Sequence, residues 1–281
     1  MDQAFDYHDT VVHSDINRAD HVRKKPERVK RLMRSYARNQ GAQTPNTVLV
    51  QDISVNGEAS MDAETVASYL NVLRKIFVVE DMPAGNPNMR SKTAIRSSDT
   101  RYYVDPSIAA TALESGPQDL LADLRTFGFL FEILCVRDLR VFADALGGEV
   151  YHYRDKNGLE CDTVIHLRNG TYGLVEIKLG GEKLIEEGSA NLRTLSAKID
   201  TNKMKAPAFF DGFDRHRGLR LPPRRRYVCN SHWLSERLIF LVPFFAYSLF
   251  TAAQFLRRWF SALTQTVTQT RNKLLPKSRT K

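Results

Sequence analysis

The sequence predicts an α+β protein, with helices through its first half and an antiparallel meander in its second half. Helical segments are indicated at 27–39 and 62–75 by apolar residues that recur every three or four positions, and at 126–146 by a longer apolar run. Three short runs rich in Val, Ile, Tyr and Thr lie within Tyr151–Lys178. An Asn-Gly pair separates each run from the next, and this pair is the strongest local signal for a tight hairpin turn.

The first part of the chain is predicted to hold two helices and two short strands. Residues 1–25 are polar with few apolar anchors, and we interpret them as a remnant or linker. Pro26 then suits the first position of a helix. Asp62 is a good N-cap for a second helix. Strands are expected at 76–80, where β-branched residues gather, and at 102–104.

The order helix, helix, strand, basic loop, strand is typical of a winged helix, which we predict for residues 26–106. In such a module the second helix and the loop can contact DNA. The basic side chains at these two places are Arg74, Lys75, Lys92, Arg96 and Arg101. The alternative is that the module packs on a neighbouring domain and contacts no nucleic acid. The second helix is only weakly basic, so both interpretations stay open.

A second domain is predicted over 107–210, and its first long helix, Thr126 to Leu146, is strongly apolar. Glu132 lies within this helix, where an acid is costly unless it has a partner or lies at an edge. One interpretation is a salt bridge to Arg137 or Arg140, or exposure at the helix edge. The other is a carboxylate that faces the sheet for a functional reason.

The meander carries the charged residues that most resemble a site. Asp162 lies on its second strand, and Glu176 and Lys178 lie on its third. Side chains two apart share a face of a strand, so Glu176 and Lys178 point the same way while Val175 and Ile177 point into the core. Two acids beside a lysine predict a metal site with a charge partner. A structural pairing of Lys178 with either acid, worth about 0.2–1 kcal/mol, is the alternative.

Composition excludes several classes of protein. The net charge of +9 comes from residues 211–281, which hold 14 Lys and Arg against 3 Asp and Glu. The three cysteines lack CxxC spacing, which argues against a disulfide framework or a zinc ribbon and fits a reducing cytoplasm. The chain has no GxxxxGK[ST] phosphate loop, so we expect no ATP site within it.

The order of a helix acid (Glu132), a strand Asp (Asp162) and Glu176-Ile177-Lys178 on the next strand resembles the PD-(D/E)XK nuclease superfamily. The longer segments resemble a bacterial and archaeal AAA-type ATP-binding protein family, in which an ATPase domain precedes a winged helix and a nuclease-like domain of unknown function. The segments that carry this second resemblance are RYYVD at 101–105, FGFLFE at 127–132, YHYRDKNGLECD at 151–162 and EIKLG at 176–180.

The resemblance implies a fragment of such a protein, with its ATPase half upstream as a partner and DNA as the substrate class. It implies that Asp162 and Glu176 bind Mg²⁺, that Lys178 orients a water or stabilises charge on the phosphate, and that Glu132 adds a carboxylate. The alternative is a non-catalytic module for recognition or for coupling to the ATPase.

The tail after about residue 210 departs from this family. It has Pro222-Pro223, three arginines and almost no acid where the resemblance implies a pair of strands. A permitted choice of codons from Phe213 onward, read from the second base, encodes strand, turn and strand. We therefore interpret residues 211–281 as the product of a frameshift near codon 211, which allows a non-functional product as a further alternative.

One apolar stretch of the tail bears on localisation. Leu238–Leu256 is 19 residues long, enough to cross a bilayer, and Arg257-Arg258 follow it. Either it is a membrane anchor or it is a fortuitous hydrophobic run, which Pro243 favours. We expect a cytoplasmic protein, with association to a membrane through this tail as the alternative.

Overall fold

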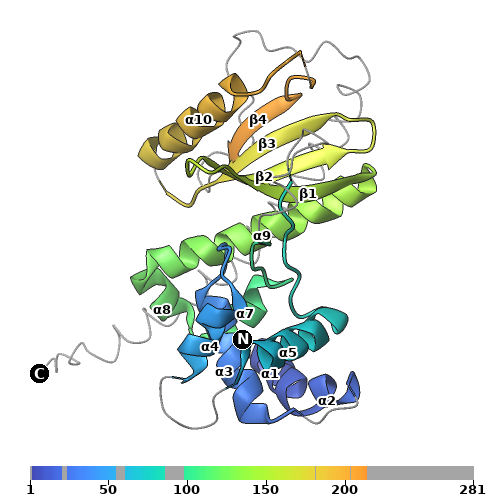
Figure 1. Ribbon diagram of the computed structural model, residues 1–281. Coiled ribbons are helices and arrows are strands. Elements are labelled where there is room, and N and C mark those ends of the chain that lie inside the picture. Colours follow the sequence, from blue (N-terminus) through green and yellow to red (C-terminus); the bar gives the residue numbers. More distant parts are fainter. Residues whose placement is uncertain are drawn as a thin grey trace, which may run out of the picture. The chain divides into compact units, whose positions relative to one another are not determined.

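Helices fill the first half of the described chain, and a four-stranded sheet follows them (Figure 1). The computed structural model describes residues 2–20, 24–54, 61–85, 98–180, 182–202 and 204–213. These belong to one structural unit, Met1–Arg217, whereas the second unit, Gly218–Lys281, lies outside the described residues. The predicted α+β class is confirmed.

The N-terminal segment, expected as a remnant or linker, folds into helices that pack against later helices of the chain. It forms α1 (Asp2–Thr10), the π-helical turn η1 (Val11–Asp15) and α2 (Ile16–Arg18). Val11, Val12 and Ile16 have no exposed surface, and α1 contacts α7, the helix that follows residue 105. The three side chains are enough apolar anchors to hold a segment that is otherwise polar.

Three helices follow where two were expected. They are α3 (Pro26–Arg38), α4 (Asn46–Ser54) and α5 (Ala63–Lys75). Asp62 caps α5 as predicted, because its side chain accepts a hydrogen bond from the Thr65 backbone N–H at 2.7 Å. The additional helix, α4, was not predicted, although Leu49 and Ile53 are four residues apart and both are buried.

The two strands expected at 76–80 and 102–104 are reduced to isolated bridges, which pair Val79 with Tyr103 and Met82 with Thr100. The predicted loop between them, 86–97, lies outside the described residues. The first strand is shorter than expected because α5 ends in a tight cap at residues 76–78, where the chain turns instead of extending.

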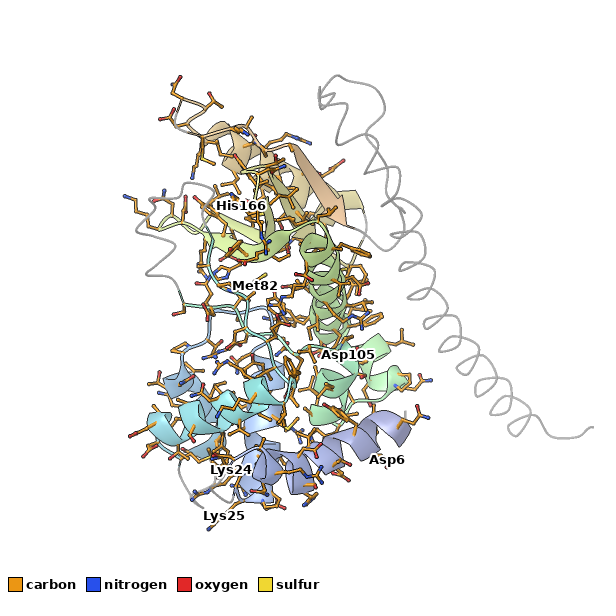
Figure 2. The ribbon with its side chains drawn as sticks, turned by 90° about the vertical axis from the view of Figure 1, so that its right-hand side faces the viewer. Asp6, Lys24, Lys25, Met82, Asp105 and His166 are labelled. Carbon is orange, nitrogen blue, oxygen red and sulfur yellow. The ribbon has the colours of Figure 1, made fainter. Side chains whose placement is uncertain are left out.

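Three helices lead to the sheet, namely α7 (Pro106–Ala112), α8 (Pro117–Ala122) and α9 (Leu124–Ala145). Asp105, labelled in Figure 2, caps α7 by accepting from the Ser107 N–H at 2.8 Å. Its other carboxylate oxygen pairs with Arg137 of α9 at 2.6 Å. One aspartate therefore joins the start of α7 to the middle of α9.

The predicted meander is confirmed as β1 (Gly148–Arg154), β2 (Glu160–Leu167) and β3 (Tyr172–Ile177), paired antiparallel in that order. Gly158 and Gly170 have φ of 82° and 78°, as the predicted Asn-Gly turns require. Helix α10 (Glu182–Ala197) then leads to β4 (Phe209–Phe213), which pairs parallel to β3.

The two long helices cover opposite faces of this sheet (Figure 1). Helix α9 packs against β1 and β2, whereas α10 packs against β2, β3 and β4. The core beneath α10 is formed by Cys161, Val164, Tyr172, Leu174, Leu192 and Leu195. Every residue of β3 is buried. This includes Glu176, which was expected to lie on a face opposite the core but contacts α10 through Asn191.

A segment of the N-terminal half extends the sheet at the β1 edge. The Gly85 N–H donates to the His152 carbonyl at 2.8 Å, and the His152 N–H donates to the Pro83 carbonyl at 3.1 Å. A Cβ on Gly85 would lie 2.3 Å from the Tyr151 Cβ, so this close approach requires glycine. The contact covers backbone groups that an edge strand would otherwise expose.

No helix in the described ranges is long and apolar enough to cross a membrane. The stretch Leu238–Leu256 lies outside those ranges.

Candidate functional site

The site forms where β2 and β3 separate. Strand β2 carries one residue more than β1 between the pairs Tyr151–Val164 and Tyr153–Cys161, which is a β-bulge. Pairing of β2 with β3 ends at Thr163 and Val175, so Asp162 is the first residue beyond the ladder. Its Oδ2 accepts a hydrogen bond from the Ile177 N–H at 2.8 Å. The carboxylate therefore takes the place of a backbone acceptor and is held between the two strands.

Lys178 joins the two predicted acids. Its Nζ lies 3.0 Å from Asp162 Oδ2 and 2.8 Å from Glu176 Oε2. The Lys178 side chain is 34% exposed, whereas that of Glu176 is 2% exposed, so the cluster opens to solvent on the lysine side. An ammonium group has three N–H donors, and these two contacts leave one for a further acceptor.

Asn191 of α10 fixes the other side of Glu176 and was not predicted from the sequence. Its amide donates to Glu176 Oε1 at 2.7 Å and to the Glu160 carbonyl at 2.6 Å, so it bridges β2 and β3. Gly188 lies one turn before it, and a Cβ there would be 3.4 Å from the Glu176 Cβ. The sequence does carry one signal for this contact. Gly188 and Asn191, a small residue and an amide, lie three positions apart and so share a face of a helix that otherwise looks surface-like.

Glu132 of α9 is held by the N-terminal half of the chain. Its Oε1 accepts a hydrogen bond from the Tyr102 hydroxyl. Neither salt bridge considered from the sequence forms, because Arg137 pairs with Asp105 and Asp138. Arg140 pairs with Glu80 instead.

Burial and mutual repulsion raise the pKa of the two glutamates. Burial raises the pKa of Glu132 above its ordinary range, and the charge of Asp162 raises it further. Burial and Asp162 also raise the pKa of Glu176, while Lys178 and Asn191 oppose the rise. Burial alone would lower the pKa of Lys178, but Asp162 and Glu176 together bring it above its usual value. Lys178 therefore stays charged at neutral pH.

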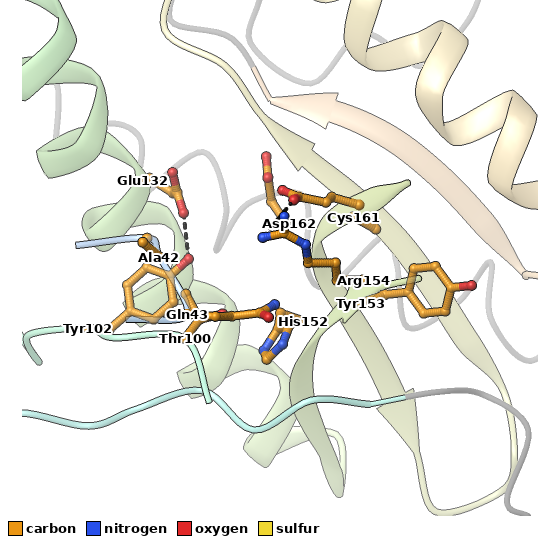
Figure 3. A pocket seen from close by; sticks show the side chains of 12 residues that line it. Ala42, Gln43, Thr100, Tyr102, Glu132, His152, Tyr153, Arg154, Cys161 and Asp162 are labelled. Carbon is orange, nitrogen blue, oxygen red and sulfur yellow. Dashed lines mark hydrogen bonds and ion pairs between the residues drawn. The ribbon is translucent and has the colours of Figure 1, made fainter. Parts of the chain in front are cut away.

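A pocket of about 210 Å³ lies beside Asp162 and Glu132 (Figure 3). Its walls come from the loop after α3, the segment Thr100–Tyr102, helix α9 and strands β1 and β2. The lining residues are Gly41, Ala42, Gln43, Thr100, Tyr102, Glu132, His152, Tyr153, Arg154, Glu160, Cys161 and Asp162. Glu176 and Lys178 do not line it. Asp162 thus connects the pocket with the lysine cluster.

Arg101, expected as a DNA contact, is an internal residue. It is 8% exposed, and its guanidinium donates to the Thr44 carbonyl at 3.0 Å, to Asp81 at 3.0 Å and to Asn46 at 2.8 Å. The sequence did not show this, because its three partners lie 20 to 57 residues away. Arg101 holds the N-terminal helices together, which corrects the expectation of a contact with DNA.

Of the other expected DNA contacts, one is half-buried, one is exposed, and two lie outside the described residues. Arg74 is half-buried and donates to Asp81 at 3.1 Å and to Asn71 at 2.9 Å. Lys75, the last residue of α5, is exposed. Lys92 and Arg96 lie outside the described residues.

The donor set fits Mg²⁺ only in an open site. Across the part of the chain that the structure describes, no group of three or more His, Cys, Asp or Glu side chains is arranged to hold a metal ion. Mg²⁺ needs fewer protein ligands, because it keeps several waters and is usually bound by one or two carboxylates with substrate phosphates. Asp162 and Glu176 offer two carboxylates at a point where both already bond one cationic group, the Lys178 ammonium.

Two family models match the chain. Residues 2–119 match Domain of unknown function (DUF8612), and residues 127–234 match Domain of unknown function (DUF4143). No curated protein and no solved structure matches. The first match includes the segment 2–20, and the second extends beyond Phe210, where the sequence suggested that the family resemblance ends. The chain therefore carries two domains of unknown function, and the acid–lysine cluster lies in the second.

Proposed function

We propose that Asp162, Glu176 and Lys178 form a Mg²⁺-dependent nuclease-like site that cleaves phosphodiester bonds in DNA. The observation that carries the proposal is the shared contact of Lys178 with both carboxylates, at 3.0 and 2.8 Å, where two strands separate. A purely structural pair needs one acid for one lysine. Two acids on one lysine leave excess negative charge at a partly open position, and a divalent cation would balance it.

The contacts of each residue support a separate role in the proposed site. Asp162 and Glu176 would hold the metal, which when bound lowers the pKa of a coordinated water and neutralises charge on the phosphate. Lys178 has one N–H donor left, which would orient the attacking water or stabilise charge that develops on a phosphate oxygen. Asn191 keeps the Glu176 carboxylate in place from the side of α10.

DNA is the substrate class that the resemblance to the AAA-type ATP-binding family implies, and we propose that the chain works together with an ATPase domain of that kind. The exposed Lys75 at the end of α5 supports contact with a phosphate backbone. Arg101 gives no such support, because its donors are used inside the protein.

A cleavage assay tests the proposal. The full chain is incubated with supercoiled DNA and Mg²⁺ or Mn²⁺, beside the variants Glu176→Ala and Lys178→Ala. We expect metal-dependent nicking by the wild type and a loss of about 10²–10³-fold in both variants, since Glu176→Ala removes a metal ligand and Lys178→Ala removes the group aimed at the reacting phosphate. Lys183→Ala is the matched control, because Lys183 lies on α10 with its side chain 89% exposed.

Equal cleavage by the wild type and by the two site variants would mean a contaminating nuclease and would end the enzyme proposal. Cleavage of RNA but not of DNA under the same conditions would keep the site and change the substrate class.

A second candidate function is a non-catalytic module that couples DNA recognition to the ATPase. One observation favours it, namely that Glu176 is 2% exposed and already satisfied by Lys178 and Asn191. Such a closed ion pair serves rigidity rather than chemistry. If the wild type binds DNA but does not nick it with either metal, this function replaces the first.

A further inference from the structure

We propose that Tyr102 is a positioning residue for the site, and that its hydroxyl holds the Glu132 carboxylate toward Asp162. The region that matches the first family model would thereby complete a site of the second. This inference rests on the proposed function, since it gives Tyr102 a role, through Glu132, beside the metal-binding Asp162.

Both the side chain and the backbone of Tyr102 are held in place. It is 1% exposed, and the guanidinium of Arg140 lies over it at 5.8 Å from the ring centroid. Its backbone N–H donates to the Tyr36 hydroxyl at 3.2 Å, and its carbonyl accepts from the Glu80 N–H at 2.9 Å. A ring held in this way presents its hydroxyl at one point, and that point is Glu132.

Gly41 contacts the same carboxylate. A Cβ placed on Gly41 would lie 2.9 Å from Glu132 Oε1 and 3.2 Å from Oε2. Gly41 also has a φ of 69°, and its N–H donates to the Arg101 carbonyl at 3.0 Å, next to Tyr102 in the chain. Two segments about 60 residues apart in sequence, joined by this bond, therefore surround Glu132 where it lines the pocket (Figure 3).

The hydrogen bond has a consequence for the cluster because Glu132 has no second donor among the described residues. Asp162 lines the same pocket and repels a neighbouring carboxylate. Without the Tyr102 hydroxyl the Glu132 side chain would turn away from Asp162 into another rotamer. The surroundings that a divalent cation meets at Asp162 would then change, because Glu132 lines the same pocket.

The test compares two conservative variants of neighbouring tyrosines, Tyr102→Phe and Tyr103→Phe, in the full chain. Tyr103 is also 1% exposed, but its hydroxyl donates to the Met33 carbonyl at 2.7 Å. It therefore bonds no residue of the candidate site. Each variant loses one buried hydroxyl and keeps its ring, so both should lose similar stability in urea. Mn²⁺ binding is measured by titration calorimetry without DNA, followed by nicking of supercoiled DNA.

We expect Tyr102→Phe to weaken Mn²⁺ binding about 10-fold to 100-fold, and Tyr103→Phe to leave it unchanged. In a Glu132→Gln background, Tyr102→Phe should cause no further loss, because Tyr102 acts through that carboxylate. Equal Mn²⁺ binding by wild type and Tyr102→Phe would overturn the inference. Mn²⁺ binding with the expected pattern but without nicking would support the inference and reject the nuclease proposal, and a wild type that binds no Mn²⁺ would reject both.

Discussion

Burial shifts the pKa of the acids and that of the lysine in opposite directions in the candidate site. It removes hydration from Glu132 and Glu176 and so raises the pKa of each, and the negative charge of Asp162 adds to both shifts. Asp162 and Glu176 in turn raise the pKa of Lys178 and keep it charged. Asp162 repels both glutamates, and a bound cation would relieve this repulsion.

The raised pKa values predict how stability depends on pH. A carboxyl with a raised pKa keeps its proton in the folded chain after the unfolded chain has lost it. For Glu132 this interval runs from the ordinary 4.5 to about 8. The free energy of unfolding in EDTA should therefore fall as pH rises from 5 to 8, and Glu132→Gln should reduce that slope. Urea unfolding at several pH values measures it, and an identical slope in the variant would contradict this assignment.

Gly41 offers a second prediction at the residue scale. Gly41→Ala introduces both a left-handed backbone strain at φ 69° and a Cβ 2.9 Å from Glu132 Oε1. Gly158→Ala, at φ 82° with nothing within 4 Å of the new Cβ, introduces the strain alone. We expect Gly158→Ala to lower the free energy of unfolding by about 1 kcal/mol and Gly41→Ala by more. Denaturant unfolding of both variants measures the difference. Equal losses of unfolding free energy would mean that the Glu132 side chain moves away from the new Cβ without cost.

The sequence indicates the residues of the cluster but not those that hold it. Asp162, Glu176 and Lys178 are recognisable because strand alternation and the Glu-x-Lys spacing place them together. Tyr102 and Gly41 are 30 and 91 residues from Glu132, and no local pattern connects them with it. Arg101 illustrates the opposite error, since a basic residue near a loop looks exposed until its partners are known.

At the scale of elements, the end of α5 is built with an unusual residue. The Val78 N–H donates to the Leu73 carbonyl and the Phe77 N–H to the Arg74 carbonyl, which is the bonding pattern of a Schellman cap. Phe77 occupies the position that normally carries glycine, with a φ of 55° and 78% exposure. This cap occupies the first residues of the strand predicted at 76–80, which is reduced to an isolated bridge at Val79. The sequence did not indicate this, because β-branched residues alone do not reveal where a helix stops.

Phe77→Gly should therefore stabilise the protein. Glycine adopts the left-handed conformation without the cost of a Cβ, and the exposed ring contributes little burial. We expect the free energy of unfolding to rise by about 0.5–1 kcal/mol, whereas Phe77→Ala, which keeps the strain, should be nearly neutral. Guanidinium unfolding distinguishes them, and a destabilised Phe77→Gly would show that the ring makes a stabilising contact.

Elements with strong local signals are those that the sequence predicts well. The Asn-Gly turns, the Asp62 cap and the apolar run of α9 all appear as expected. Helix α4 was missed because it is only nine residues long, and the helices at 2–18 were missed because polar residues surround three buried anchors.

At the scale of the whole molecule, the two regions that match separate family models meet at the site. Residues 82–85 extend the sheet at β1, and Tyr102 bonds Glu132. The sequence left open that the first module packs on a neighbouring domain. It did not indicate which residues make the contact, since these pairs are distant in the chain.

The tail carries a prediction that structure does not address, because residues 214–281 lie outside the described ranges. If a frameshift lies near codon 211, the gene must use codons that encode strand, turn and strand when read from the second base. The nucleotide sequence across codons 205–235 decides this, and codons that forbid the alternate reading would end the hypothesis.

The central claim is that Asp162 and Glu176 form a divalent-cation site beside Lys178. Anomalous diffraction from crystals grown with Mn²⁺ locates such an ion directly. We expect a peak within about 2 Å of a carboxylate oxygen from each acid, with Lys178 displaced from at least one of its present contacts at 3.0 and 2.8 Å. If crystals grown with Mn²⁺ show no peak at these two carboxylates and both lysine contacts are intact, Asp162 and Glu176 do not form a divalent-cation site.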